Sequence, residues 1–262
     1  MRCALLLLLA MTALGAPPAH AEIDRSHTAW TALLVRHAKL QDARGTASRV
    51  DYAGFARERA ELRRYLDSLA RVTPAELGAL PRADQIAFWI NAYNAATVEL
   101  ILTEYPKRAS IRDYGSLLRS PWRKPFVRLL GEKLTLDQIE HERLRGERGY
   151  GEPRIHFAVN CASIGCPMLR EEAFTGAKLE AQLEQQTLRF LSDRARNRYD
   201  PRTRVLALSS IFDWYAGDFA GGDLRRFLAP YADALGASRA SLAASEIEFL
   251  DYDWRLNDLT TR

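Results

Sequence analysis

One long helix, predicted from Ala83 to Glu104, constrains the fold of this chain more than any other feature. The segment is rich in apolar residues, and Pro106 ends it. Its centre, Phe88-Trp89-Ile90-Asn91-Ala92-Tyr93-Asn94, is apolar nearly all round. A helix without a polar face is buried on every side. The rest of the chain must therefore pack around this segment.

Helices and a few short strands are predicted on either side of the central helix. Capping boxes at Thr73 and Thr135 mark the starts of two helices, the second ending near Gly146. Apolar spacing predicts further helices over residues 52–69, 179–191, 210–215 and 224–228, a hairpin over 126–134, and strands over 154–160, 205–208 and 247–254. Strands so few and so irregularly interleaved with helices indicate an α+β protein. We expect a helix-rich domain around a small, mostly antiparallel sheet.

The first 21 residues have the layout of a secretory signal peptide. Arg2 is a short basic start, an apolar stretch runs from Leu5 to Leu14, and Ala19-His20-Ala21 fits a cleavage site. The apolar core is too short to span a bilayer. We therefore predict a signal peptide over residues 1–21 and a single globular domain over 22–262. The mature protein is expected in the periplasm or outside the cell, without stable insertion in a membrane.

Composition argues against a nucleic-acid partner. The chain has 37 Lys and Arg against 33 Asp and Glu, a net charge of +4. Nucleic-acid binding proteins usually gather their basic residues on one surface. Here the basic residues lie among acidic ones, as in Arg57-Glu58-Arg59. This pattern is typical of a solvated surface of mixed charge.

The densest cluster of reactive side chains is the segment from His156 to Pro167. A strand would place His156 and Asn160 on one face, with Cys161 in the loop that follows. A thiol becomes nucleophilic when a nearby histidine favours its thiolate. His156 or His141 could act as that base, although His141 could equally be a surface or helix-packing residue.

The cysteines allow two other interpretations. In an oxidising compartment Cys161 and Cys166 could pair as a disulfide. A zinc site of the pattern His-x4-Cys-x4-Cys would lack the usual closely spaced ligand pairs. We therefore expect no metal and no cofactor, and leave the disulfide open beside the catalytic thiol.

Two further polar positions are candidates for supporting roles. Asn91 and Asn94 lie on the apolar helix, and buried amides must be hydrogen-bonded. The interpretation we favour is that they tie down a loop, but Asn94 could also orient a base or stabilise an oxyanion. Asp213 belongs to an acidic and aromatic cluster with Asp218. Asp213 could orient the base, or the residues of this cluster could simply cap a helix.

Several of these segments resemble the signature blocks of the family known as domain of unknown function 547. The resemblance is carried by Phe88–Asn94, Leu136–His141, Ile155–Ser163, Ser210–Tyr215 and Phe249–Trp254. It covers about residues 52–257 and implies a single domain that is often exported in bacteria.

The cysteine and histidine blocks are also somewhat similar to those of papain- and transglutaminase-like thiol enzymes. In that class the nucleophile usually precedes its histidine in the chain. Here His141 and His156 both precede Cys161, so the resemblance implies a permuted arrangement.

Together these observations lead to two hypotheses. The first is an exported thiol hydrolase or acyl-transfer enzyme that acts on an amide or peptide-like bond of a small or peptide-like substrate. Its nucleophile would be Cys161, its base His141 or His156, and its supporting group Asn94 or Asp213. The alternative is a non-catalytic periplasmic binding or accessory protein with a Cys161–Cys166 disulfide.

Overall fold

The computed structural model describes residues 23–115, 120–145 and 149–261. The predicted signal peptide and Gly146 lie outside these ranges. No helix within the described ranges is long and apolar enough to cross a membrane.

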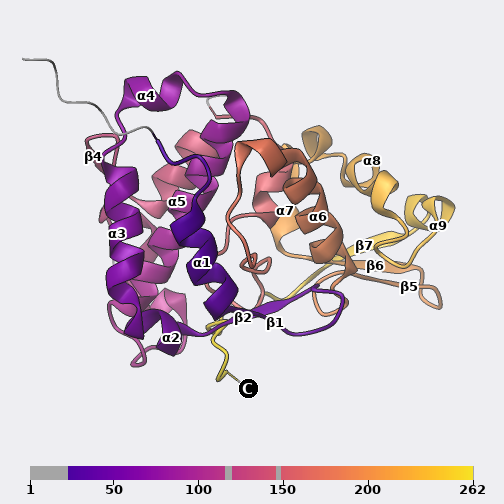
Figure 1. Ribbon diagram of the computed structural model, residues 1–262. Coiled ribbons are helices and arrows are strands. Elements are labelled where there is room, and N and C mark those ends of the chain that lie inside the picture. The colour runs from indigo at the N-terminus through magenta and orange to yellow at the C-terminus, as the bar shows by residue number, and fades with distance from the viewer. Residues whose placement is uncertain (1–22, 116–119, 146–148, 262) are drawn as a thin grey trace, which may run out of the picture.

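The N-terminal half is a group of helices packed around one central helix, α5 (Figure 1). Helix α5 spans Arg82–Leu102, close to the predicted range, and every residue from Ile86 to Val98 is buried. The other helices of this half are α1 (Thr28–His37), α2 (Tyr52–Arg57), α3 (Arg59–Ala70) and α4 (Pro74–Gly78). The burial of α5 on all faces confirms the role that its composition predicted.

The C-terminal half combines short helices with a three-stranded sheet (Figure 1). Its elements are α6 (Leu179–Ser192), β5 (Arg198–Asp200), β6 (Val205–Ser209), α7 (Ile211–Trp214), α8 (Leu224–Leu228), α9 (Arg239–Ala243) and β7 (Glu246–Leu250). Strand β6 lies in the middle, antiparallel to β5 and parallel to β7. This half has its own hydrophobic cluster, which includes Phe157, Phe190, Phe212 and Phe219.

Two short antiparallel hairpins complete the strands in the described ranges. They are β1 (Ala38–Leu40) with β2 (Ser48–Val50), and β3 (Val127–Leu129) with β4 (Glu132–Leu134). The second hairpin is the one predicted over residues 126–134. The helix-rich α+β class is confirmed, although the described strands form three small sheets rather than one. The permuted papain-like arrangement stays a prediction.

The predicted strand over residues 154–160 is wrong. The chain forms a 3₁₀ helix there, η4 (Pro153–Phe157), which begins with a proline and is capped by the Glu152 side chain. Ile155 and Ala158 pack into the N-terminal core, whereas Phe157 packs into the C-terminal one. Ile155 and Phe157 are two residues apart but pack into different cores. Apolar residues at every second position therefore gave the spacing of a strand, although the chain is helical there.

The helix predicted after Thr135 is present but has an unusual geometry. Thr135 and Gln138 form the expected reciprocal cap, with donor–acceptor distances of 3.1 and 3.0 Å. The segment Gln138–Leu144 is then a π-helix, labelled η3. π-helical turns are rare and occur frequently at functional sites.

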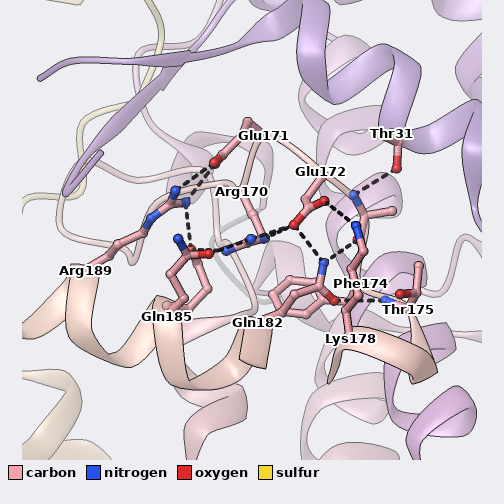
Figure 2. A network of polar contacts seen from close by, with 12 residues as sticks. Thr31, Arg170, Glu171, Glu172, Phe174, Thr175, Lys178, Gln182, Gln185 and Arg189 are labelled. Atoms are coloured by element: carbon pink, nitrogen blue, oxygen red, sulfur yellow. Dashed lines mark hydrogen bonds and ion pairs between the residues drawn. The ribbon is translucent and has the colours of Figure 1, made fainter. Parts of the chain in front are cut away.

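A polar network fixes the segment that leads into α6 (Figure 2). Glu172 accepts hydrogen bonds from Arg170 at 2.6 Å and from Gln182 of α6 at 3.1 Å. Asn91 of α5 binds both backbone groups of Phe174, at 2.7 and 3.0 Å. The chain between the cysteine loop and α6 is thus attached to elements of both halves.

Candidate active site

A pocket of about 230 Å³ lies where the two halves meet, and Cys161 is in its wall. The helices α5 and η3 supply one side, and the segments around α7 and after β7 supply the other. The lining residues are Tyr93, Trp122, Asp137, Glu140, His141, His156, Val159, Cys161, Cys166, Pro167, Ile211, Trp214, Tyr215, Tyr252 and Trp254. The cavity is small, with room for a group about the size of an amino-acid side chain.

The loop that carries Cys161 is held by asparagine side chains. Asn94 of α5 donates to the Ala158 carbonyl at 3.0 Å and accepts from the Asn160 backbone N–H at 2.8 Å. Asn160 in turn donates to the Pro167 carbonyl and accepts from the Ala162 N–H. Ala162 has φ +63°, a left-handed conformation that costs a non-glycine residue free energy. Such conformations gather at functional sites because the surrounding structure holds them in place.

The environment of the Cys161 sulfur favours the thiolate. The pKa of Cys161 is lowered from 9.0 to about 7, first by the hydrogen bond with Cys166 and then, against burial, by the Ser163 and Tyr252 hydroxyls. Its Sγ lies 3.1 Å from the Tyr252 hydroxyl and 3.5 Å from that of Ser163. Cys161 is half-buried and lines the pocket.

Cys166 has the opposite character. It is buried, and burial followed by the hydrogen bond and charge of Cys161 raises its pKa well above the ordinary value. Its sulfur accepts a hydrogen bond from the Cys161 backbone N–H at 2.8 Å. Both cysteines are free thiols in this structure. The pair therefore divides into one half-buried, acidic thiol and one buried thiol beside it.

His156 forms an acid–base pair with a carboxylate. Its Nε2 lies 2.7 Å from Asp218 Oδ2, and its buried ring stacks on Tyr215 with the centroids 4.2 Å apart. Arg145 donates to the same carboxylate oxygen at 2.7 Å. The hydrogen bond with His156, followed by that with Arg145, holds the pKa of Asp218 far below its usual range despite partial burial. Asp218 thus stays ionised and orients the imidazole.

His141 lies at the rim of the pocket and is partly exposed. Its Nδ1 is 2.6 Å from Nη1 of Arg145, and its Nε2 is 3.9 Å from Asp137. A guanidinium can only donate, so His141 Nδ1 accepts this hydrogen bond. That nitrogen is therefore occupied. His156 lines the pocket of Cys161 and is oriented by a carboxylate, so it is the candidate base of the two histidines.

Within the described residues, neither Asn94 nor Asp213 is hydrogen-bonded to the Cys161 sulfur, whose hydrogen-bond partners include Ser163 and Tyr252. Asn94 is buried and uses both ends of its amide to hold the backbone before Cys161, which matches the anchoring interpretation. Asp213 is exposed and does not line the pocket. Asp218, in the same acidic and aromatic cluster, is the carboxylate that meets His156. Nothing in the sequence indicated that Asp218, five residues after Asp213, would be the carboxylate that contacts His156.

The structure also shows side chains in the pocket that the sequence pattern missed. Tyr252 reaches the sulfur from the C-terminal segment, and Glu140 and Tyr215 line the same pocket. Long-range contacts of this kind leave no local pattern in the sequence. Across the described residues, no three His, Cys, Asp or Glu side chains are grouped so that they could hold a metal ion.

These features define a helix-rich α+β protein with a cysteine-containing pocket between two cores. Residues 77–191 match the family described as "Protein of unknown function, DUF547", which supports the resemblance that the sequence blocks indicated. The matched range includes three of the five blocks that carried the resemblance; those at 210–215 and 249–254 lie beyond it. No curated protein and no solved structure matches the chain.

Proposed function

We propose that this protein is a thiol hydrolase or acyl-transfer enzyme acting on an amide or peptide-like bond, with Cys161 as nucleophile, His156 as base and Asp218 as orienting carboxylate. The observation that carries the proposal is the shared pocket. It is lined by a partly exposed thiol of lowered pKa and by a histidine that a carboxylate orients. Nucleophile, base and orienting group together are the parts that acyl transfer requires.

The reaction would follow from the positions of these groups. His156 takes the proton of the Cys161 thiol, and the thiolate adds to the carbonyl carbon. The resulting tetrahedral intermediate expels the amine, which takes that proton from His156. This leaves a thioester on Cys161. Water or an acceptor amine then attacks the thioester, with His156 removing its proton, and the thiolate is released. Asp218 binds Nε2 of His156, so the proton would move through Nδ1.

A papain- or transglutaminase-like likeness would require a rearranged order of these residues. His156 precedes Cys161, and Asp218 follows both. Catalytic groups of this kind are recognised by geometry rather than by chain order. A permuted papain- or transglutaminase-like enzyme therefore remains part of the proposal.

An activated ester tests the proposal without knowledge of the natural substrate. We expect p-nitrophenyl acetate to acetylate Cys161, detected by mass spectrometry of the peptide, with hydrolysis of the thioester following. Cys161→Ala abolishes the adduct, and His156→Ala and Asp218→Asn slow its hydrolysis. Asp213→Asn is the matched control because it removes an exposed carboxylate of the same cluster. Acetylation of other residues but not Cys161 would overturn the assignment of the nucleophile.

The non-catalytic alternative makes a different prediction for the two cysteines. A binding or accessory protein with a Cys161–Cys166 disulfide has no free thiol when it is isolated under non-reducing conditions. The enzyme hypothesis requires both thiols to be free, as they are in this structure. Counting thiols in the denatured, unreduced protein separates the two hypotheses.

Export to the periplasm or the exterior is also part of the proposal. It is supported by the basic start, apolar stretch and small-residue cleavage site within residues 1–21. N-terminal sequencing of the protein from a periplasmic fraction should give a chain that starts at Glu22. A chain that retains Met1 would contradict it.

A further inference from the structure

Glu140 is a buried carboxylate in the pocket of Cys161. It comes from the π-helix η3, is only 7% exposed and lines the pocket together with Cys161 and His156. Burial, followed by the nearby Glu140 carboxylate, raises the pKa of Tyr215 well above its ordinary value. Within the ranges that the structure describes, no Lys, Arg or His forms an ion pair with Glu140.

The neighbouring carboxylates are all compensated. Asp137 also lines the pocket, but Arg123 lies 3.1 Å from it. Asp218 is paired with Arg145 at 2.7 Å. Of the two carboxylates that line the pocket, Glu140 is the one without an ion pair among the described residues. Burying an unpaired charge is costly, so such a site gains free energy when a cation enters it.

Aromatic rings form a second part of the pocket wall. Trp122, Trp214, Tyr252 and Trp254 come from three separate segments and contact one another, with centroid distances between 4.5 and 5.8 Å. All four line the pocket, and Trp214 is 47% exposed although it is large and apolar. The faces of Trp and Tyr rings attract cations, most strongly where water is excluded.

We propose that this pocket binds a cationic nitrogen group of the substrate, an ammonium or guanidinium, with Glu140 as its counter-ion and the aromatic rings around it. The carboxylate supplies the opposite charge and the rings supply cation–π attraction in a space the size of one side chain. The substrate class is then a basic peptide-like compound or an amine. This inference rests on the proposed role of Cys161 as the reacting group of the same pocket.

Alkylation of Cys161 with charged probes tests this inference. Three iodoacetamides are used that share one reactive group and end in an ammonium, a hydroxyl or a carboxylate. The sulfur of Cys161 displaces iodide in each case, and mass spectrometry assigns the adduct to Cys161. Each rate constant is divided by that for N-acetylcysteine amide. We expect the ammonium probe to react about tenfold faster than the hydroxyl probe, and the carboxylate probe to react slowest.

Two variants give the matched comparison. Glu140→Gln should bring the ratio of ammonium to hydroxyl probe close to one. Because a change in the pKa of Cys161 affects both probes equally, the ratio reports binding of the cation alone. Glu142→Gln removes the same charge from an exposed position of the same helix and should retain the preference. Circular dichroism of each variant establishes that it is folded.

The outcomes separate this inference from the proposed function. If no probe labels Cys161, the assignment of the nucleophile fails. If the hydroxyl probe labels Cys161 but the wild-type protein shows no preference for the ammonium probe, only the cationic pocket is overturned. An equal loss of preference in Glu142→Gln also overturns it, because the effect would then arise from net charge. The wild-type ratio decides the question even if Glu140→Gln does not fold.

Discussion

At the scale of single residues, Asn91 and Asn94 show how a polar side chain in an apolar helix can position a distant segment. Each uses its amide oxygen and nitrogen to bind backbone groups, Asn91 at Phe174 and Asn94 at Ala158 and Asn160. The sequence predicted that buried amides would be satisfied in this way, because each needs a partner. It did not indicate which segment they hold, since the contacts span more than sixty residues.

The two asparagines give a matched pair of variants. Asn94→Ala and Asn91→Ala each leave two backbone groups without a partner, so each should lower the free energy of unfolding by roughly 2–4 kcal/mol. Only Asn94 holds the backbone before Cys161. Asn94→Ala should therefore also slow alkylation of Cys161, whereas Asn91→Ala should not. Denaturant unfolding and labelling kinetics measure the two effects, and equal labelling in both variants would contradict the role given to Asn94.

At the scale of elements, the sequence predicted regular helices well and the segments beside the pocket poorly. The ends of α5, the cap of α4 and the β3–β4 hairpin follow from apolar spacing, capping boxes and turn residues. The 3₁₀ helix η4 and the π-helix η3 do not, because tertiary packing and not local preference determines their form. The segment from Arg170 to Thr175 has no regular structure, and its contacts with α6 hold it (Figure 2).

Glu172, in the segment from Arg170 to Thr175, should make the free energy of unfolding depend on pH. Hydrogen bonds from Arg170 and Gln182 and the charges of Arg170 and Lys178 outweigh burial and lower the pKa of Glu172 from 4.5 to about 2. A carboxylate whose pKa is lower in the folded state stabilises the protein above its unfolded pKa. This contribution is lost as the pH falls from about 5 to 2. Unfolding measured across this window should show a weaker pH dependence in Glu172→Gln, and an unchanged slope would contradict the assignment.

At the scale of the whole molecule, the candidate site lies between two hydrophobic cores. One short helix, η4, contributes residues to both cores. The pocket takes Tyr93 and Glu140 from one half and Tyr215 and Tyr252 from the other. The sequence indicated the α+β class and the importance of the cysteine loop. It could not indicate Asp218, Glu140 or Tyr252 as neighbours of Cys161 and His156, because only the packing of the halves brings them together.

The burial of Phe157 in the C-terminal core leads to a prediction about the free energy of unfolding. Phe157 of η4 is fully buried and lies against Phe190 and Phe219, with centroid distances of 5.0 and 5.8 Å. Phe157→Ala should therefore lower the free energy of unfolding by about 3–5 kcal/mol. Phe249→Ala, at a position 43% exposed, should change it by less than about 1 kcal/mol. Similar values for the two variants in denaturant unfolding would contradict this description of the core.

The most direct test of the account is the pH dependence of Cys161 alkylation by iodoacetamide in the reduced wild-type protein. The thiolate is the reacting form, so the rate should rise through a midpoint near pH 7 and level off above pH 8. In Cys166→Ala the midpoint should move toward higher pH, because the hydrogen bond that lowers the pKa most is removed. A wild-type midpoint near 9, or alkylation of Cys166 in preference to Cys161, would contradict the claim that Cys161 is an activated nucleophile.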